Sequence, residues 1–191
     1  MRIAVAVSGG GSNLQALLDF LRPGGRSSVS LVLSNSSKAG GLGRAEAKGV
    51  PTAVFRDPAD GGEWLALLEG HGIDLIVLAG YLKLVPAEVI AAYRGKIINI
   101  HPALLPKFGG AGMYGRRVHE AVLAAGERES GCTVHLVDEV YDRGAILAQA
   151  KVAVRPDDTP ESLAARVLAA EHKLLPAVIE MWPMKPMRLP S

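Results

Sequence analysis

The chain has 191 residues, of which 49% are hydrophobic and 21% charged, a length and balance typical of one α/β domain and unlike those of a disordered chain. The formal net charge is only +2 and no basic stripe is visible, which argues against a strong nucleic-acid binder. Cys132 is the one cysteine, so a disulfide within the chain is excluded and a cysteine-based zinc site is nearly so.

The first half of the sequence alternates short apolar runs with helical patterns. Apolar runs of a few residues indicate buried strands, and leucines spaced three and four apart indicate helices. Strands that alternate with helices predict a parallel sheet with helices on both faces. In chain order we expect a strand at 3–7, a helix at 13–21, a strand at 29–33, helices at 42–48 and around 64–68, and strands at 73–78 and 97–100.

The second half changes character at residues 102–115, where frequent proline and glycine predict a loop. A helix is expected at 118–125. Two strands, at 133–137 and 146–154, are expected to pair as antiparallel neighbours across a turn at 138–144.

A last helix is predicted to begin at Thr159 and Pro160, since threonine is a favoured N-cap and proline fits the first helical position. From Pro183 onward, three prolines predict an irregular tail. The expected fold is therefore a mostly parallel, doubly wound, Rossmann-like sheet with helices on both faces and an antiparallel addition toward the C-terminus.

A glycine-rich turn, Ser8-Gly9-Gly10-Gly11-Ser12-Asn13, joins the first strand to the first helix. Glycines let backbone N–H groups approach an anion, a helix N-terminus favours negative charge, and Ser12 or Asn13 could cap the helix. The turn lacks the Gly-Lys-Ser/Thr ending of a Walker A loop, and Leu14 stands where a dinucleotide fingerprint needs glycine. Two interpretations remain open: a phosphate cradle, or a turn that only closes a strand–helix corner.

Asn99 and His101 end the apolar strand at 97–100. Side chains alternate along a strand, so these two are expected to point the same way, at the strand end where doubly wound sheets place their chemistry. An amide and an imidazole on one face could both donate hydrogen bonds to a developing oxyanion. The alternative is a histidine that makes a structural hydrogen bond at a strand end.

Three carboxylates, Asp138, Glu139 and Asp142, lie in the predicted turn, and spacing alone does not choose among them because turn aspartates are usually solvated or bond their own backbone. Cys132 is expected to be a buried structural residue rather than a nucleophile. No histidines and carboxylates show the spacing of a metal site.

The N-terminus runs straight into the first strand, without the apolar stretch and cleavage site of a signal peptide. No apolar run approaches the ~20 residues needed to span a bilayer. We therefore expect a cytoplasmic protein with no membrane partner and no nucleic-acid partner.

Several segments together resemble the glycinamide ribonucleotide formyltransferases, a branch of the folate-dependent formyltransferases. The resemblance covers nearly the whole chain in order. Its Asn-x-His-Pro-x-Leu-Leu-Pro run is specific to the folate formyltransferases as a group, and the early Gly-Ser-Asn and short length select the branch. The matching segments are Gly11-Ser12-Asn13, Leu78-Ala79-Gly80-Tyr81-Leu82-Lys83, Asn99-Ile100-His101-Pro102-Ala103-Leu104-Leu105-Pro106-Lys107, Gly131-Cys132-Thr133-Val134-His135, and Asp142-Arg143-Gly144 followed by Ile146-Leu147-Ala148-Gln149.

The resemblance implies a single formyltransferase domain over 1–191, with a nucleotide-phosphate half at about 1–100 and a folate and catalytic half at about 101–191. It implies a monomer or homodimer, glycinamide ribonucleotide as substrate, 10-formyltetrahydrofolate as co-substrate, and no metal. The implied catalytic residues are Asn99, His101 and Asp142, the substrate phosphate would be held by Gly11, Ser12 and Asn13, the ribose by Glu171, and the folate by Leu82, Lys83, Leu84, Val85, Asn99, Asp138, Glu139, Val140, Tyr141 and Asp142.

The implied reaction is a direct attack of the substrate amine on the formyl carbon. Asn99 and a protonated His101 would donate to the oxyanion, and a carboxylate from Asp142 would raise the pKa of His101 and help move the amine proton. A loop and a single residue depart from the family pattern. The loop at 108–115 is longer than the usual Pro-Gly-Leu-His form, and Lys83 replaces the arginine that many members carry.

Three rival functions remain. A formyltetrahydrofolate hydrolase shares the Asn, His and Asp trio but usually carries an extra N-terminal regulatory domain. A methionyl-tRNA formyltransferase adds a basic C-terminal domain. The sequence starts at its first predicted strand, ends soon after its last predicted helix and has a net charge of only +2, so we expect neither of these two enzymes. A non-catalytic nucleotide-binding module would use the glycine-rich turn and leave Asn99 and His101 unexplained.

Overall fold

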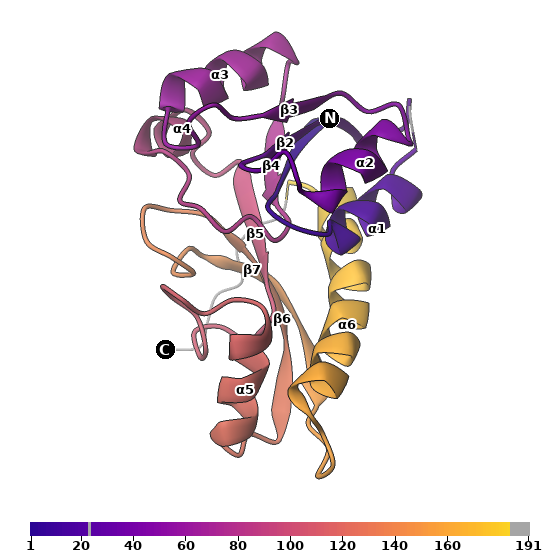
Figure 1. Cartoon of the computed structure of the whole chain (residues 1–191), viewed down its shortest axis with the longest axis vertical. Helices are drawn as coiled ribbons and strands as arrows, with labels where there is room; N and C mark the ends of the chain where they lie inside the picture. The colour runs from indigo at the N-terminus through magenta and orange to yellow at the C-terminus, as the bar shows by residue number, and fades with distance from the viewer. Residues whose placement is uncertain (23, 184–191) are drawn as a thin grey trace. The chain divides into compact units, whose positions relative to one another are not determined.

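The computed structural model describes residues 1–22 and 24–183, so the predicted irregular tail lies almost wholly outside the described residues. Over these residues the chain forms seven strands and six helices (Figure 1). It divides into two compact units, Met1–Ile98 and Asn99–Ser191. The boundary falls inside strand β5 (Ile97–His101), so Asn99 and His101 belong to the second unit.

The strands are hydrogen-bonded in the order β3-β2-β1-β4-β5-β6-β7. Strand β1 pairs in parallel with β2 and β4, β2 pairs in parallel with β3, and β6 pairs antiparallel with β7. This mixed sheet, mostly parallel with antiparallel strands near the C-terminus, confirms the predicted fold class.

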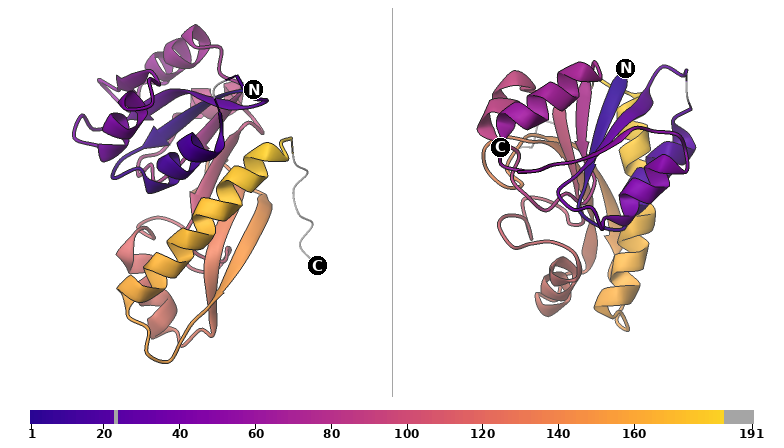
Figure 2. Two further views of the ribbon diagram at one scale, coloured as in Figure 1. Left: turned by 90° about the vertical axis from the view of Figure 1, so that its right-hand side faces the viewer. Right: turned by 45° about the horizontal axis from the view of Figure 1, so that its top comes forward.

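The first unit is built around β1, whose residues Ile3 to Val7 are fully buried because strands pair with both of its edges and helices cover both faces of the sheet (Figure 2). Helix α1 contacts α2, and α3 contacts α4, and the two pairs lie on opposite sides of the strands (Figure 2). The elements are β1 (Arg2–Val7), α1 (Ser12–Phe20), β2 (Ser28–Ser34), α2 (Gly40–Glu46), β3 (Thr52–Val54), α3 (Gly61–Gly70), β4 (Leu75–Leu78) and α4 (Ala87–Ala92).

Two of these elements were not predicted from the sequence. Strand β3 has only three residues and is partly exposed, and helix α4 has only six, so neither carries a readable period. The expectation that Ser12 or Asn13 caps helix α1 was wrong. The N-cap is Gly11, in a left-handed conformation with φ 71°, and no side chain caps the helix.

The second unit places two helices on its antiparallel strands. Helix α6 contacts both β6 and β7, and α5 contacts α6. Their shared core holds Val122, Cys132, Leu163 and Val167. The elements are β5 from Asn99 on, α5 (Arg116–Ala124), β6 (Glu129–Leu136), β7 (Ile146–Ala153) and α6 (Pro160–Glu180).

The predicted start of the last helix is confirmed. The Thr159 hydroxyl accepts a hydrogen bond from the Ser162 N–H, the Ser162 hydroxyl accepts from the Thr159 N–H, and Pro160 is the first helical residue. The predicted antiparallel pair is also confirmed, although β6 begins at Glu129, earlier than expected.

Candidate active site

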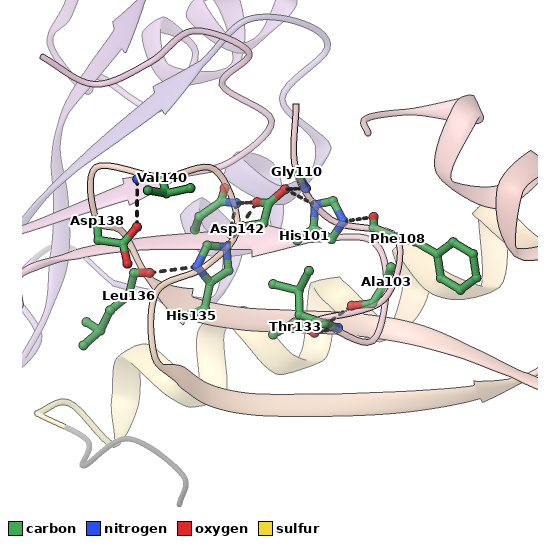
Figure 3. Close-up of polar contacts among 12 residues, drawn as sticks. His101, Ala103, Phe108, Gly110, Thr133, His135, Leu136, Asp138, Val140 and Asp142 are labelled. Carbon is green, nitrogen blue, oxygen red and sulfur yellow. Dashed lines mark hydrogen bonds and ion pairs between the residues drawn. The ribbon is translucent and has the colours of Figure 1, made fainter. Parts of the chain in front are cut away.

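The second unit brings Asn99, His101 and Asp142 together. The Asn99 amide nitrogen donates to Oδ1 of Asp142 at 3.4 Å, and Nδ1 of His101 lies 3.5 Å from Oδ2 of the same carboxylate. The His101 and Asp142 side chains are only 5% and 9% exposed; Figure 3 shows the contact between them. Asp142 is thus the turn carboxylate that faces the two strand-end residues, which spacing alone could not establish.

His135 completes this cluster from strand β6. Its Nδ1 lies 2.8 Å from the carbonyl of Leu136, so this nitrogen carries the proton and donates. In the neutral ring, Nε2 is then an acceptor, and it takes a hydrogen bond from the Asn99 amide at 3.0 Å. The ring therefore fixes which way the Asn99 amide faces. The register of β6 on β7 shifts between Val134 and His135, an irregularity of the kind that re-aims side chains near functional sites.

A loop after His101 closes over the cluster. The carbonyl of Phe108 lies 2.8 Å from Nε2 of His101, and the N–H of Gly110 donates to Oδ2 of Asp142 at 2.9 Å (Figure 3). Among the described residues, Phe108 and Asp142 are the non-glycine residues with positive φ, at 57° and 55°. This left-handed backbone is uncommon for such residues, and at both positions it aims a polar group at His101 or at its partners.

Thr133 supports the segment that follows His101. Its buried hydroxyl donates to the carbonyl of Ala103 at 2.6 Å and accepts from the N–H of Leu105 at 3.1 Å. The side chain of Gln149 donates to the same hydroxyl and to the carbonyl of Leu105, both at 2.9 Å. Strands β6 and β7 therefore hold residues 103–105 in place.

The pKa shifts of His101 and Asp142 favour a neutral imidazole beside an ionised carboxylate. Burial lowers the pKa of His101, and the opposing effects of the Asp142 carboxylate and the Phe108 carbonyl are smaller. Burial acts to raise the pKa of Asp142. The opposing effects are larger together: Nε2 of His135, 3.5 Å from Oδ1, lowers this pKa when it carries a proton, as do the charge of a protonated His101 and the Gly110 N–H, and the net pKa lies below its usual range. The Asp142 carboxylate does raise the pKa of His101, as expected, but burial outweighs it, so the expected net rise of this pKa toward neutral pH was wrong.

The glycine-rich turn lies in the first unit, where three loops meet at Ser8. The Ser8 hydroxyl donates to Oδ1 of Asn35 at 2.6 Å and accepts from the N–H of Leu82 at 2.9 Å. A Cβ on Gly11 would lie 2.6 Å from Cα of Gly41, so only glycine fits there. The first backbone N–H groups of α1 have no acceptor within the helix and point toward the glycine-rich turn, and such a helix N-terminus favours an anion.

The remaining predicted binding residues divide between the units. Leu82 and Leu84 of the first unit are 49% and 55% exposed, Lys83 is exposed, and Val85 is buried. In the second unit Val140 and Tyr141 are exposed, and Asp138 accepts from the Val140 N–H at 2.9 Å. Glu139, between Asp138 and Val140, is exposed.

Glu171, the predicted ribose contact, lies on helix α6 and is only 5% exposed. Its charge acts on the thiol of Cys132, whose pKa is raised to about 12, first by burial. Cys132 is thus a buried, unreactive thiol, as the sequence predicted.

Sequence reasoning missed four contributors: His135, Thr133, the Phe108 carbonyl and Ser8. His135 and Thr133 could have been found, because they alternate along one strand and so share a face. The carbonyl of Phe108 could not, since it depends on a left-handed residue within a loop.

Within residues 1–22 and 24–183, no group of three or more His, Cys, Asp or Glu side chains is placed to hold a metal ion. Over the same part of the chain, no helix has the length and apolar character needed to cross a membrane.

Comparison with known proteins decides the family. The sequence pattern described as "Formyl transferase" matches residues 1–179. The chain belongs to the formyl transferase family. Among relatives of this formyl transferase, the Haemophilus influenzae protein named "Phosphoribosylglycinamide formyltransferase" is 39% identical over 199 residues, which cover 98% of this chain and 90% of that protein.

The Arabidopsis thaliana protein named "Phosphoribosylglycinamide formyltransferase, chloroplastic" is 48% identical over 186 residues, which cover 93% of this chain and 64% of that protein. The chain therefore spans slightly less than two thirds of the length of this relative. The crystal structure of phosphoribosylglycinamide formyltransferase from Brucella melitensis is 44% identical, with a TM-score of 0.85 and coverage of 100% of this chain and 98% of that one.

Proposed function

We propose that this formyl transferase moves the formyl group of 10-formyltetrahydrofolate to the amino group of glycinamide ribonucleotide, a step of purine synthesis. The observation that carries the proposal is the buried cluster of Asn99, His101 and Asp142 in a chain whose relatives bear the name of that activity. The products would be formylglycinamide ribonucleotide and tetrahydrofolate.

The reaction needs an oxyanion donor and a proton acceptor. The substrate amine attacks the formyl carbon, a tetrahedral oxyanion forms, and the bond from that carbon to the folate nitrogen breaks. The amine loses one proton and the folate nitrogen gains one. Asn99 and a His101 protonated on Nδ1 supply N–H groups for the oxyanion. Asp142 is ionised at neutral pH because its pKa lies below its usual range, so it can take the proton of the attacking amine and pass it on toward the folate nitrogen.

In the free site these donors are already engaged with protein acceptors. The two amide hydrogens of Asn99 point at His135 and Asp142, and Nε2 of His101 donates to the carbonyl of Phe108. The hydrogen bond from Asn99 to Asp142, at 3.4 Å, is the longest of these and would yield first to a substrate oxygen. Nδ1 of the neutral His101 carries no hydrogen and lies 3.5 Å from Asp142. Negative charge on that oxygen would favour a second proton on Nδ1 of His101, which Asp142 would also stabilise.

For the substrates we propose the assignments that follow from the family pattern. Gly11, Ser12 and Asn13 would hold the phosphate and Glu171 the ribose. The folate would lie against 82–85 and 138–142, and the high exposure of Leu82, Leu84, Val140 and Tyr141 supports this, since apolar side chains left in water suit a flat aromatic ligand. The single domain, the monomer or homodimer and the cytoplasmic location stay predictions; the Arabidopsis relative is named as a chloroplast protein.

One assay tests the proposal. The purified protein is mixed with 10-formyltetrahydrofolate, with and without glycinamide ribonucleotide, in metal-free buffer, and release of tetrahydrofolate is followed. Release that requires the ribonucleotide is the expected result. Equal release in both reactions would instead identify a formyltetrahydrofolate hydrolase, and no release in either would contradict both enzymes.

The binding-module alternative has its own test. Replacing Asn99 by alanine is expected to lower turnover by at least about a hundredfold, as loss of one oxyanion donor typically does, while affinity for the ribonucleotide changes little. Unchanged turnover in Asn99→Ala would contradict the catalytic assignment.

A further inference from the structure

Helix α2 reaches the glycine-rich turn of the first unit through Arg44. Nε of Arg44 donates to the carbonyl of Gly10 at 2.7 Å, and Nη1 donates to Oε1 of Gln15 at 3.1 Å. Gln15 belongs to the first turns of α1, so one planar guanidinium joins the turn to the helix that follows it.

A second contact from α2 acts on the preceding peptide. The N–H of Gly41 donates to the carbonyl of Gly9 at 3.1 Å. Two successive carbonyls, those of Gly9 and Gly10, are therefore held toward α2. In a trans peptide the C=O and N–H point in opposite directions, so the N–H groups of Gly10 and Gly11 are turned away from α2.

Successive N–H groups that point to one side form a concavity for an anion. Arg44 lies behind this concavity, because its Nε occupies the carbonyl side of the same peptides. Its side chain passes close to the turn, with Cδ 3.5 Å from the position that a Cβ on Gly11 would occupy.

We propose that Arg44 is a positioning residue for the phosphate of the ribonucleotide. It orients the Gly10–Gly11 peptide through Nε and ties that peptide to α1 through Gln15, and it does not itself bind the phosphate. The inference rests on the proposed function for the identity of the substrate, and on the geometry of the turn for the presence of a phosphate site.

The feature to test is the pair of hydrogen bonds that the Arg44 guanidinium makes to Gly10 and Gln15. Arg44 uses two nitrogens, at different places along its side chain, to reach two acceptors at once. A lysine carries the same charge on one flexible nitrogen and cannot make both bonds in this geometry. Arg44→Lys and Arg44→Met should therefore behave alike, whereas a role through charge alone would let lysine rescue the function.

The experiment measures phosphate binding and turnover on the same variants. Inorganic phosphate is titrated while the melting temperature is followed, with chloride at equal ionic strength as the reference. Each variant is expected to show a dissociation constant for phosphate about tenfold higher, which corresponds to about 1.4 kcal/mol. In the transfer assay, KM for glycinamide ribonucleotide should rise by a similar factor, while kcat and KM for the formyl donor stay within about twofold.

Lys96→Met is the matched control for loss of one positive charge. Lys96 is exposed, and its carbonyl accepts a hydrogen bond from the N–H of Ile76, near the start of β4. The glycine-rich turn follows the end of the parallel strand β1, so Lys96 lies at the opposite end of these strands. It should match the wild type in phosphate binding and KM.

Three results would overturn the inference: unchanged phosphate binding in Arg44→Met, recovery of wild-type binding in Arg44→Lys, or no stabilisation of the wild type by phosphate. Weaker phosphate binding in both variants, without any transfer of the formyl group, would support the inference and count against the proposed function. The two failures are therefore distinguishable.

Discussion

Oδ2 of Asp142 lies 3.5 Å from Nδ1 of His101 and accepts a hydrogen bond from the Gly110 N–H at 2.9 Å. One carboxylate oxygen thus links the strand-end histidine to the loop that follows it, while Oδ1 faces Asn99. Any change at Asp142 acts on the chemistry and on the loop together.

Replacing Asp142 by asparagine is expected to lower kcat by about 10²–10⁴-fold, because the proton acceptor is lost while the shape is kept. Steady-state kinetics with saturating substrates would measure this. Asp157→Asn, which neutralises an exposed carboxylate of the same unit, is the control and should retain full activity. Activity within a few fold of wild type in Asp142→Asn would rule out Asp142 as the acceptor.

His135→Phe should destabilise the fold and slow the reaction. The ring volume is kept, but the Asn99 amide and the Leu136 carbonyl each lose a partner in a buried place, which costs about 1–3 kcal/mol in unfolding free energy. We expect kcat to fall by about tenfold because the amide of Asn99 is no longer held. Urea unfolding and kinetics measure the two effects.

The control for that change is His71→Phe. Nδ1 of His71 also lies near a carbonyl, that of Leu67 at 2.9 Å, but in the first unit and at a less buried place. It should lose little stability and no activity. Equal kcat in His135→Phe and wild type would show that Asn99 does not depend on His135.

Thr133→Val tests the support of residues 103–105. The two side chains have the same shape, but valine leaves the Ala103 carbonyl, the Leu105 N–H and one hydrogen of Gln149 without the hydroxyl. A loss of about 1–3 kcal/mol in unfolding free energy is expected by urea denaturation.

Thr52→Val is the matched control for that change, because among the described residues the partner of the Thr52 hydroxyl is Glu46, at a long 3.5 Å and an exposed place. Its effect should stay within about 0.5 kcal/mol. Similar losses of unfolding free energy in the two variants would show that the buried hydroxyl of Thr133 contributes no more to stability than an exposed one.

Acid should destabilise the protein in a window set by His101. Its pKa in the folded protein is lowered by burial, so the unfolded chain binds a proton near pH 6.5 that the folded protein still excludes. Stability from this group is therefore complete above about pH 6.5 and is lost as the pH falls toward the folded pKa. The lowered pKa of Asp142 has the same sign but acts only below about pH 4.

The measurement is urea unfolding at several values between pH 7.5 and 5 for the wild type and His101→Gln. Burial also lowers the pKa values of His119 and His172, and the charge of His101 lowers that of His119 further, so the wild type has a slope from all three residues. The difference between the two proteins reports His101 together with its effect on His119. The variant should lose less stability on acidification. Parallel slopes would contradict a lowered pKa at His101.

The sequence predicted features that repeat with a period and missed those set by single backbone angles. The buried strand β1 and the shared face of Asn99 and His101 follow from apolar runs and from alternation. Asp142 could not be chosen from the turn, because its direction depends on a φ of 55° and on the pairing of β6 with β7.

The same limit explains the wrong expectations. A serine or asparagine at the start of a helix usually caps it, but here the N-cap is a left-handed Gly11, at a place where Gly41 leaves no room for a side chain. The pKa of His101 depends on how deeply the ring is buried, which a strand end in a sequence does not state. Spacing identifies neighbours along the chain, and it does not measure the burial that decides protonation.

The burial of Cys132 has a practical consequence. A thiol with no exposed surface and a pKa of about 12 is almost entirely protonated at neutral pH and stays inert to maleimide reagents. Because it is the only cysteine, a second one introduced at Ala111, an exposed position in the loop after His101, would be the single reactive thiol. A fluorescent dye attached there would report movement of that loop during turnover without any change to the native cysteine.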